Sequence, residues 1–580
     1  MESMSRRHFF AITTACTAAA ALAAVPPARS AAIHSEPSAP PPEPLRRFIV
    51  EYMRAMNAPG LTLALANVQG PQSIAAFGLA DLDAKTPLTT LYRFEIGSIT
   101  KSCAALVILQ LQDEGKLDVQ HPILRYLPWL PIETDFGEIR IHHLLTHSSG
   151  MPTSDGHLVP TESGARLRQS FQPGTQFHYS NWGFAVLGRL IESIDGVSWP
   201  AAVSRRLFAP LGMTDTAAAI SSATRARIVS SYVPLHDERP YPRHGALVRA
   251  GNLTFTAASG SIASTPLDMA RYLQMLLNRG AGPSGRVISA EGFTLFSTAH
   301  IAADEFGPGA SYGYGIAVDT LDGHRRLRHT GGMASFMSSM QIDLDAGVAA
   351  FASVNAQLGY RPNPVTQYAI QVLRAAAERK PPPPAPPADE AAEVKDAAGF
   401  AGVYRAPDGR SLEVITEHDQ LTLLADGRRI PLQHVREDQF IAQDPKFSLY
   451  LILFGREPAP AGGAQPGAAA PAVIEMGYGP DWFAHSRHAN LAAVPSAPDL
   501  APYPGLYCSN DPFVGSTRMV VRRGKLWSEG VTPLTPIGDR LFRFSDEPSS
   551  PETAEFRGII DGRAEILVLG GDVLQRVPEV

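Results

Sequence analysis

A proline-rich run at 381–387 divides this sequence into two parts with different patterns. Six of its seven residues are proline, and a segment of that composition forms a stiff, extended spacer. Before it, long apolar runs of helical length alternate with strand-like segments. After it, only short alternating segments occur. We therefore predict a large domain at 46–380, a linker at 381–395 and a second region at 396–580.

The second region carries a weak internal repeat. At offsets of about 102 residues, Gly402-Val-Tyr404 recurs as Gly505-Leu-Tyr507, Pro431-Leu432 as Pro533-Leu534, and Phe440 as Phe542. Segments such as 412–416 fit half-buried antiparallel strands. Two small β-barrels, at 396–495 and 496–580, or one barrel of two halves, would account for the repeat. The alternative is a chance match of turn signals.

Composition excludes several classes of protein. The 580 residues carry 56 acidic and 50 basic side chains, a net charge of −6, which leaves no electrostatic footprint for nucleic acid or an anionic membrane. The three cysteines, Cys16, Cys103 and Cys508, are too few for a disulfide scaffold or a cysteine-rich metal site. We expect Cys103 and Cys508 to be free thiols.

The first 30 residues predict an export signal. Arg6 and Arg7 precede an uncharged, alanine-rich run at 11–25, which is shorter than the roughly 20 residues that span a bilayer. Ser-Arg-Arg-x-Phe-Phe resembles a twin-arginine signal; the alternative is an ordinary signal with two chance arginines. Residues 31–45 would form a proline-rich linker. The mature protein would be periplasmic or secreted, without stable membrane insertion.

The large domain alternates between strand-like and helical patterns. Residues 61–67 and 73–79 predict a strand pair, and helices are predicted at 98–114, 182–194, 265–279 and 364–379. Strand-like patterns return at 312–318, 324–329 and 338–355. Strands at both ends with helices between them indicate a sheet with a helical insertion.

The strongest chemical signal is Ser98-Ile-Thr-Lys101, at the start of the predicted helix 98–114. Positions i and i+3 share a helix face, so the hydroxyl and the amine can meet. A serine nucleophile needs an adjacent base, and lysine serves only when neutral. Lowering a lysine pKa from about 10.4 to about 7 takes about 4–5 kcal/mol, and burial works in that direction. Only 7 of the 50 basic residues are lysines. The alternative is a capping serine and a surface lysine.

Two later segments carry groups that suit the same chemistry. In Phe177-His-Tyr179-Ser-Asn181, the tyrosine can relay a proton to a leaving group and the asparagine amide can bind a substrate carbonyl. Otherwise Tyr179 is a core aromatic and Asn181 a helix N-cap. In His329-Thr330-Gly331-Gly332, the glycines allow close approach of a substrate and can expose an N–H to an oxyanion. Alone, this segment is an ordinary turn.

Together and in this order, Ser-x-x-Lys, Tyr-x-Asn and His-Thr-Gly resemble the serine β-lactamase and penicillin-binding-protein superfamily. The flanking stretches 94–98, 141–150 and 173–183 look like the class C β-lactamase-type branch, over about 46–380. The resemblance implies an α/β fold: an antiparallel sheet flanked by helices with a helical subdomain, followed here by an all-β barrel region. The resemblance also implies a reaction that needs no cofactor or metal, and a role for each residue of the site. Ser98 would be acylated, and Lys101 and Tyr179 would share the proton transfers. The backbone N–H groups of Ser98 and Gly332 would bind the oxyanion. The residues that contact substrate would be Asn181, His329, Thr330, Gly331 and Gly332.

One departure from the family pattern concerns His329. Many members carry lysine there, whose charge meets a substrate carboxylate, whereas histidine is mostly neutral at periplasmic pH. A neutral histidine recognises a carboxylate less well than lysine does, which lowers the expectation of β-lactam turnover or carboxypeptidase action. Histidine at this position resembles the D-aminopeptidase group, some members of which append small β-barrels. His143 and His147 lie four apart on a predicted helix, but no third ligand has useful spacing, so we predict no metal.

The leading hypothesis is an exported serine hydrolase that cleaves amide bonds of small peptides, including peptides with D-residues or released from a cyclic peptide. Alternatives are a carboxylesterase on the same scaffold, a β-lactamase or penicillin-binding DD-peptidase, and an inactive relative that binds peptide or envelope material. The expected partner is a small peptide or ester, not nucleic acid. The sequence leaves the oligomeric state open.

Overall fold

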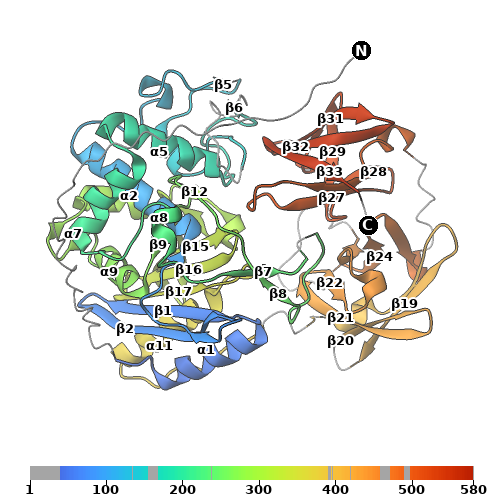
Figure 1. The fold of residues 1–580 in the computed structure, drawn as a ribbon, viewed down its shortest axis with the longest axis horizontal. Coiled ribbons are helices and arrows are strands. Elements are labelled where there is room, and N and C mark those ends of the chain that lie inside the picture. Colours follow the sequence, from blue (N-terminus) through green and yellow to red (C-terminus); the bar gives the residue numbers. More distant parts are fainter. Residues whose placement is uncertain are drawn as a thin grey trace, which may run out of the picture. The chain divides into compact units, whose positions relative to one another are not determined.

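The computed structural model describes residues 39–133, 135–153, 167–236, 238–389, 394, 396–417, 420–457, 471–488 and 497–578. The predicted export signal and most of the linker 31–45 lie outside the described residues. Residues 39–580 form one compact unit. It holds a mixed α/β part, here called the N-terminal part, followed by two barrels (Figure 1). Within the described ranges, no helix is long and apolar enough to cross a membrane.

A nine-stranded antiparallel sheet runs through the N-terminal part in the order β12-β13-β14-β15-β16-β17-β1-β2-β3. Its strands are β1 (Gly60–Asn67), β2 (Gly70–Asp81), β3 (Thr86–Pro87), β12 (Ile301–Ala302), β13 (Ser311–Tyr312), β14 (Ala317–Leu321), β15 (His324–Met333), β16 (Phe336–Asp343) and β17 (Val348–Val354). The predicted pairing of the first two strands is confirmed. The predicted strand at 312–318 is in fact two short strands, because Gly315 adopts a left-handed conformation between them.

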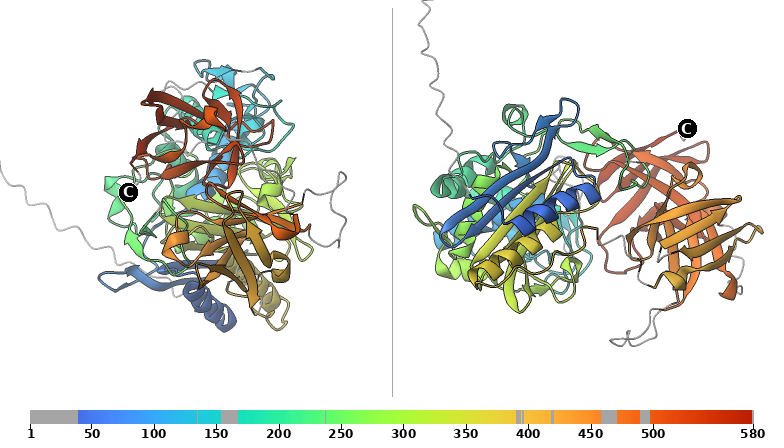
Figure 2. Two further views of the ribbon diagram at one scale, coloured as in Figure 1. Left: turned by 90° about the vertical axis from the view of Figure 1, so that its right-hand side faces the viewer. Right: turned by 90° about the horizontal axis from the view of Figure 1, so that it is seen from below.

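Helices cover both faces of this sheet. Side chains alternate along β1: Leu61, Leu63 and Leu65 belong to one apolar cluster, whereas Ala64 and Ala66 belong to another. The first cluster includes α1 (Glu43–Ala55) and α11 (Asn363–Ala377), which lie side by side in Figure 2. The second includes α9 (Pro266–Leu277). Both β16 and β17 are buried along their whole length, and β17 also reads as a nearly continuous apolar run, as expected of a strand that is covered on both faces.

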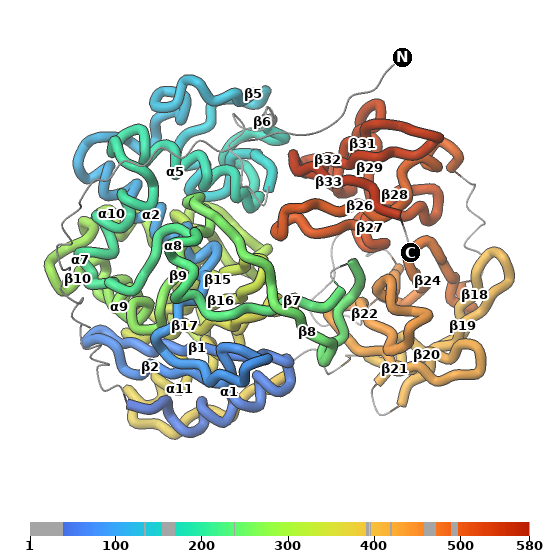
Figure 3. Tube along the Cα trace, viewed as in Figure 1, coloured from blue at the N-terminus to red at the C-terminus, as the bar shows by residue number. Residues whose placement is uncertain are grey.

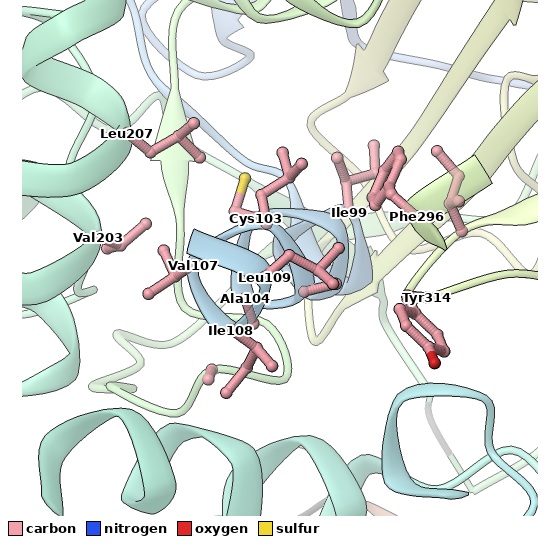
Figure 4. Packing of buried hydrophobic residues seen from close by; sticks show 14 of the residues in the cluster. Ile99, Cys103, Ala104, Val107, Ile108, Leu109, Val203, Leu207, Phe296 and Tyr314 are labelled. Atoms are coloured by element: carbon pink, nitrogen blue, oxygen red, sulfur yellow. The ribbon is translucent and has the colours of Figure 1, made fainter. Parts of the chain in front are cut away.

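The helical subdomain is built around α2 (Thr100–Asp113), which is buried from Thr100 to Leu111. Figure 4 shows its Cys103, Val107 and Ile108 side chains among apolar residues of neighbouring elements. Besides α1, α2, α9 and α11, the α-helices that the structure describes in the N-terminal part are α3 (Ile141–Leu145), α5 (Asn181–Asp195), α6 (Trp199–Val203), α7 (Ala209–Leu211), α8 (Ser222–Arg225) and α10 (Ala290–Ser297). The predicted helix 98–114 is confirmed with one change: Ser98 lies in a 3₁₀ turn, η1 (Gly97–Ile99), that leads into α2.

Two closed antiparallel barrels of eight strands follow, so the repeat marks two barrels rather than two halves of one. The first is β18 (Gly402–Arg405), β19 (Ser411–Glu417), β20 (Gln420–Ala425), β21 (Arg428–Arg436), β22 (Gln439–Ala442), β23 (Ile452–Arg456), β24 (Val473–Tyr478) and β25 (Asp481–His485). The second is β26 (Gly505–Cys508), β27 (Ser516–Arg522), β28 (Lys525–Ser528), β29 (Thr532–Gly538), β30 (Leu541–Arg543), β31 (Thr553–Ile560), β32 (Arg563–Leu569) and β33 (Asp572–Val577).

The repeated tyrosine has the same role in both barrels. The hydroxyl of Tyr404 donates to the carbonyl of Phe400 at 2.6 Å, and that of Tyr507 donates to the carbonyl of Tyr503 at 2.9 Å. Both tyrosine side chains are fully buried. A buried hydroxyl needs such a partner, which explains why tyrosine recurs at this position. Within the part of the chain that the structure describes, Cys103 and Cys508 are not joined in a disulfide.

Candidate active site

Ser98 stands on a turn that is pressed against β15. The turn follows β4 (Phe94–Glu95), which pairs with β9 (Ala263–Ser264). Gly97 has a φ of 54°, and a Cβ on it would lie 2.7 Å from the carbonyl oxygen of Gly332. A Cβ on Gly331 would lie 1.9 Å from the carbonyl oxygen of Ile96. Only glycine permits this backbone contact, which brings the first and third motifs together.

Lys101 lies at the centre of the site and is fully buried. Its Nζ lies 3.0 Å from Ser98 Oγ, 2.6 Å from Asn181 Oδ1 and 2.8 Å from the carbonyl oxygen of Ser259. Nζ is placed to donate to all three oxygens. Accepting the serine proton requires the neutral amine, in which Asn181 and Ser259 would take the two N–H groups and the lone pair would face the Ser98 hydroxyl. Asn181 Oδ1 is thereby engaged, which leaves its amide NH₂ as the group that can donate to a substrate.

Tyr179 closes the other side of the serine–lysine pair. Its ring centroid lies 4.9 Å from Lys101 Nζ. Burial raises the pKa of the Tyr179 phenol above its ordinary value, and hydrogen bonding with Ser98 opposes that rise only in part. The phenol therefore stays protonated. This favours Tyr179 as a proton donor and relay, and Lys101 as the group that first accepts the serine proton.

Tyr179 packs against His147, for which a metal-binding role was considered and set aside. The two rings are 4.2 Å apart, and His147 Nδ1 accepts the backbone N–H of Ser180 at 2.9 Å. His147 has a φ of 55° beyond the end of α3, so the prediction that His143 and His147 share a helix is wrong. Burial lowers the His147 pKa well below its ordinary value, so the ring is neutral.

The N-cap of α5 is Ser180 rather than Asn181. The Ser180 hydroxyl accepts the N–H of Gly183 at 3.1 Å and donates to the carbonyl of Pro152 at 2.8 Å. Asn181 is the first residue of the helix, and its side chain is directed to Lys101. The suggested capping role of Asn181 is therefore wrong, because the preceding serine already satisfies the helix terminus.

His329 is buried in the wall of the site with both ring nitrogens engaged. Nδ1 donates to the carbonyl of Thr330 at 2.6 Å, and Nε2 accepts the hydroxyl of Tyr312 at 2.8 Å. Burial lowers the His329 pKa to about 3, so the ring is neutral. Both ring nitrogens of His329 are thus engaged within the protein, and its predicted contact with substrate stays a prediction. Thr330 and Gly332 are half-buried on the same strand, and Gly331 is buried.

Arg361 supplies the cation that His329 does not. Its Nη2 lies 3.5 Å from the place where a Cβ on Gly332 would stand, and the residue is exposed. Its charge also lowers the pKa of Tyr179 and of His329, which places it within electrostatic reach of both. It precedes α11, far along the chain from Ser98. No motif in the sequence marks it.

The second barrel contacts the segment that carries Tyr179. Glu552 Oε1 accepts the N–H of Thr153 at 2.5 Å and lies 2.9 Å from His178 Nε2. The Thr153 hydroxyl in turn donates to the carbonyl of Tyr179. A carboxylate from the second barrel thus ties together two segments beside the reactive groups. Sequence reasoning missed this contact, because nothing near Glu552 resembles a motif. Among the described residues no cluster of possible metal ligands occurs.

Comparison with known proteins identifies the class to which this fold and site belong. The Beta-lactamase family model matches residues 45–375, and the chain belongs to that family. It is 28% identical to Penicillin-binding protein 4 of Amycolatopsis lactamdurans over 52% of this chain and 81% of the relative. It is 32% identical to Esterase EstB of Burkholderia gladioli over 42% of this chain and 71% of the relative. The family consists of serine hydrolases.

A solved structure resembles more of the chain than the family model covers. The octameric penicillin-binding protein homologue from Pyrococcus abyssi superposes with a TM-score of 0.53 at 25% identity, over 76% of this chain and 98% of its own. The predicted resemblance to the β-lactamase and penicillin-binding-protein superfamily is therefore confirmed, as is the α/β fold followed by an all-β barrel region.

Proposed function

We propose that this protein hydrolyses amide bonds of small peptides, including peptides with D-residues, through an acyl-enzyme on Ser98. The observation that carries the proposal is the 3.0 Å contact between Ser98 Oγ and a buried Lys101 amine that also contacts two oxygen acceptors, Asn181 Oδ1 and the carbonyl of Ser259. That arrangement provides an activated nucleophile with its base in place.

The proposed steps use residues already described. Lys101 accepts the Ser98 proton while Oγ attacks the scissile carbonyl, and the oxyanion is bound by the backbone N–H groups of Ser98 and Gly332. The Tyr179 phenol passes a proton to the leaving nitrogen and is reprotonated from Lys101. The C–N bond then breaks and leaves an ester on Ser98. Water then attacks this ester, and its proton passes through Tyr179 and Lys101 to Ser98 Oγ while the acyl C–Oγ bond breaks. This step releases the carboxylic acid and restores the free serine.

Arg361 supports a particular kind of peptide substrate. An exposed guanidinium beside Gly332 offers a charge-assisted contact to a carboxylate near the scissile bond, which a neutral His329 does not. We therefore propose short peptides with a free carboxylate close to the bond that is cleaved.

A carboxylesterase is the second candidate, and the similarity to Esterase EstB favours it. An activated serine with an oxyanion hole cleaves esters more easily than amides. The test compares short peptides of L and D configuration that carry a free carboxylate beside the scissile amide with p-nitrophenyl acyl esters, and includes nitrocefin. The proposal expects hydrolysis of these peptides that Ser98→Ala abolishes. Turnover of esters alone would leave the esterase, and turnover of nitrocefin alone would favour a β-lactamase.

We also propose export through the twin-arginine signal at residues 1–30. The test is fractionation of cells that express the full chain or the double variant Arg6→Lys, Arg7→Lys. The native chain should reach the periplasm in a processed form, and the variant should stay in the cytoplasm. Equal export of both would contradict a twin-arginine route.

A further inference from the structure

A cavity of about 910 Å³ lies where the N-terminal part meets both barrels. The hairpin of β7 (Tyr232–Pro234) and β8 (Leu247–Arg249) contributes one wall and extends toward the first barrel in Figure 3. The β26–β27 loop of the second barrel contributes another. Apolar side chains from all three bodies line the cavity: Leu235, Val248, Leu358, Ile441, Leu451 and Phe513. Its size is that of a site for a small organic ligand.

A buried carboxylate also lines this cavity. Glu95, on β4, is only 2% exposed. Its Oε2 atom is buried and has no hydrogen-bond partner among the described residues. Burying an unpaired carboxylate is costly, and native structures rarely keep one unless it has a use. Burial raises the Glu95 pKa to about 7, and the charge of Arg225 on α8 opposes the rise in part.

Other charged side chains around the cavity already have partners. The carboxylate of Glu529 accepts the backbone N–H of Arg518. The guanidinium of Arg239 lies 2.8 Å from Glu238 Oε1, and that of Arg243 pairs with Asp389. Asp511 accepts the N–H of Phe513 at 2.9 Å. Two buried polar atoms of the lining have no hydrogen-bond partner among the described residues, Glu95 Oε2 and Ser516 Oγ, and of these only the Glu95 carboxyl can carry a charge. A ligand with a positive charge would recover the interactions that Oε2 lacks.

We propose that this cavity binds an organic ammonium compound with an apolar body, with its charged group on Glu95 and its apolar body against the walls contributed by the two barrels. This binding site is separate from the hydrolase reaction, because binding of the ammonium compound does not involve Ser98. Glu95 is three residues ahead of Ser98 on the same segment, so the new site lies next to the turn that carries the nucleophile.

The experiment is a calorimetric titration of the native protein at pH 8, where Glu95 is ionised, with three probes of one shape: 4-phenylbutylamine, 4-phenylbutanol and 4-phenylbutyrate. We expect the amine to bind at least tenfold more tightly than the alcohol, and the acid to bind least. The titration is repeated on protein blocked with a fluorophosphonate, or on Ser98→Ala if the reagent does not react. Unchanged amine binding there places the ligand outside the serine site, and lost binding would overturn the proposal.

Variants locate the charge. Glu95→Gln should remove the preference for the amine over the alcohol, whereas Glu529→Gln, which changes a carboxylate on the second-barrel wall, should keep it. Val248→Trp fills the cavity from a 37% exposed position and should weaken all binding. If Glu95→Gln does not fold, the three probes and Val248→Trp still decide. Equal affinity for amine and alcohol, or an unchanged preference in Glu95→Gln, would overturn the proposal.

Discussion

Two of the three oxygen atoms described above as contacts of Lys101 Nζ belong to groups that cannot exchange a proton. The carbonyl of Ser259 and the amide oxygen of Asn181 only accept hydrogen bonds, so of these three contacts the Ser98 hydroxyl is the one that can give Nζ a proton. A guanidinium cannot substitute for this amine, because arginine is not deprotonated in proteins.

Lys101→Arg should therefore reduce the acylation rate by roughly 10³-fold or more, the scale of a lost general base. The measurement is the rate of covalent labelling by a fluorophosphonate probe. Lys116→Arg is the matched control, because Lys116 is an exposed side chain 2.7 Å from Glu114, and its labelling rate should not change. Full activity of Lys101→Arg would show that lysine does not act as the base.

Arg361 gives a second test at a single residue. Arg361→Ala should raise the KM for peptides with a free carboxylate by roughly 10- to 100-fold, the equivalent of one charge-assisted hydrogen bond. It should leave the KM for uncharged acyl esters nearly unchanged. Arg46→Ala, an exposed arginine on α1 paired with Glu43, serves as the control. An equal rise for both kinds of substrate would mean that Arg361 supports the fold rather than the carboxylate.

Individual elements differ in how far the sequence predicted them. The buried helix α2 was predictable because residues 103–109 form an uninterrupted apolar run and Gly115, with a φ of 70°, follows the end of the helix. The start of α5 was not resolved to the residue, because Ser180 and Asn181 are both good N-caps and only packing against Lys101 selects between them. The contacts of His147 with the backbone N–H of Ser180 and the ring of Tyr179 were not predictable, because both partners lie on another segment of the chain.

The Ser180 cap couples a helix terminus to the site. Ser180→Ala should lower the free energy of unfolding by about 1 kcal/mol and also lower kcat, because Asn181 follows the cap directly. Ser289→Ala is the control: it removes the N-cap of α10, whose hydroxyl accepts the N–H of Gly292 at 2.8 Å. It should give a similar stability loss with normal kcat. Denaturant titration and steady-state kinetics measure both, and an equal kcat effect would contradict the coupling.

At the scale of the whole molecule, the N-terminal part and the two barrels could be predicted from the sequence, but the contacts between them could not. The proline run and the repeat around Tyr404 and Tyr507 led to two barrels, because each barrel repeats one local pattern. Contacts between distant segments leave no such pattern: the pairing of Glu552 with His178 and the guanidinium of Arg361 beside Gly332 arise only when the chain has folded. The same holds for the cavity that Glu95 lines.

Buried neutral histidines make the fold sensitive to acid. The folded-state pKa of His329 is about 3, below its ordinary 6.5, so the unfolded chain takes up the proton first as the pH falls. The contribution of His329 to the free energy of unfolding is therefore full above about pH 6.5. As the pH falls from there to about 3, this contribution should decrease by up to about 1.4 kcal/mol per pH unit. Urea denaturation between pH 7 and 4 measures this. His329→Gln should flatten the slope, and the exposed His236→Gln should not; an unchanged slope in His329→Gln would contradict the account.

The central claim is that Ser98 is the residue that becomes acylated. Intact-protein and peptide mass spectrometry after incubation with a fluorophosphonate, acyl esters and short peptides tests it most directly. The account predicts a single mass increment that maps to Ser98, absent in Ser98→Ala and greatly slowed in Lys101→Arg. An increment on another residue, or the same labelling in Ser98→Ala, would contradict it.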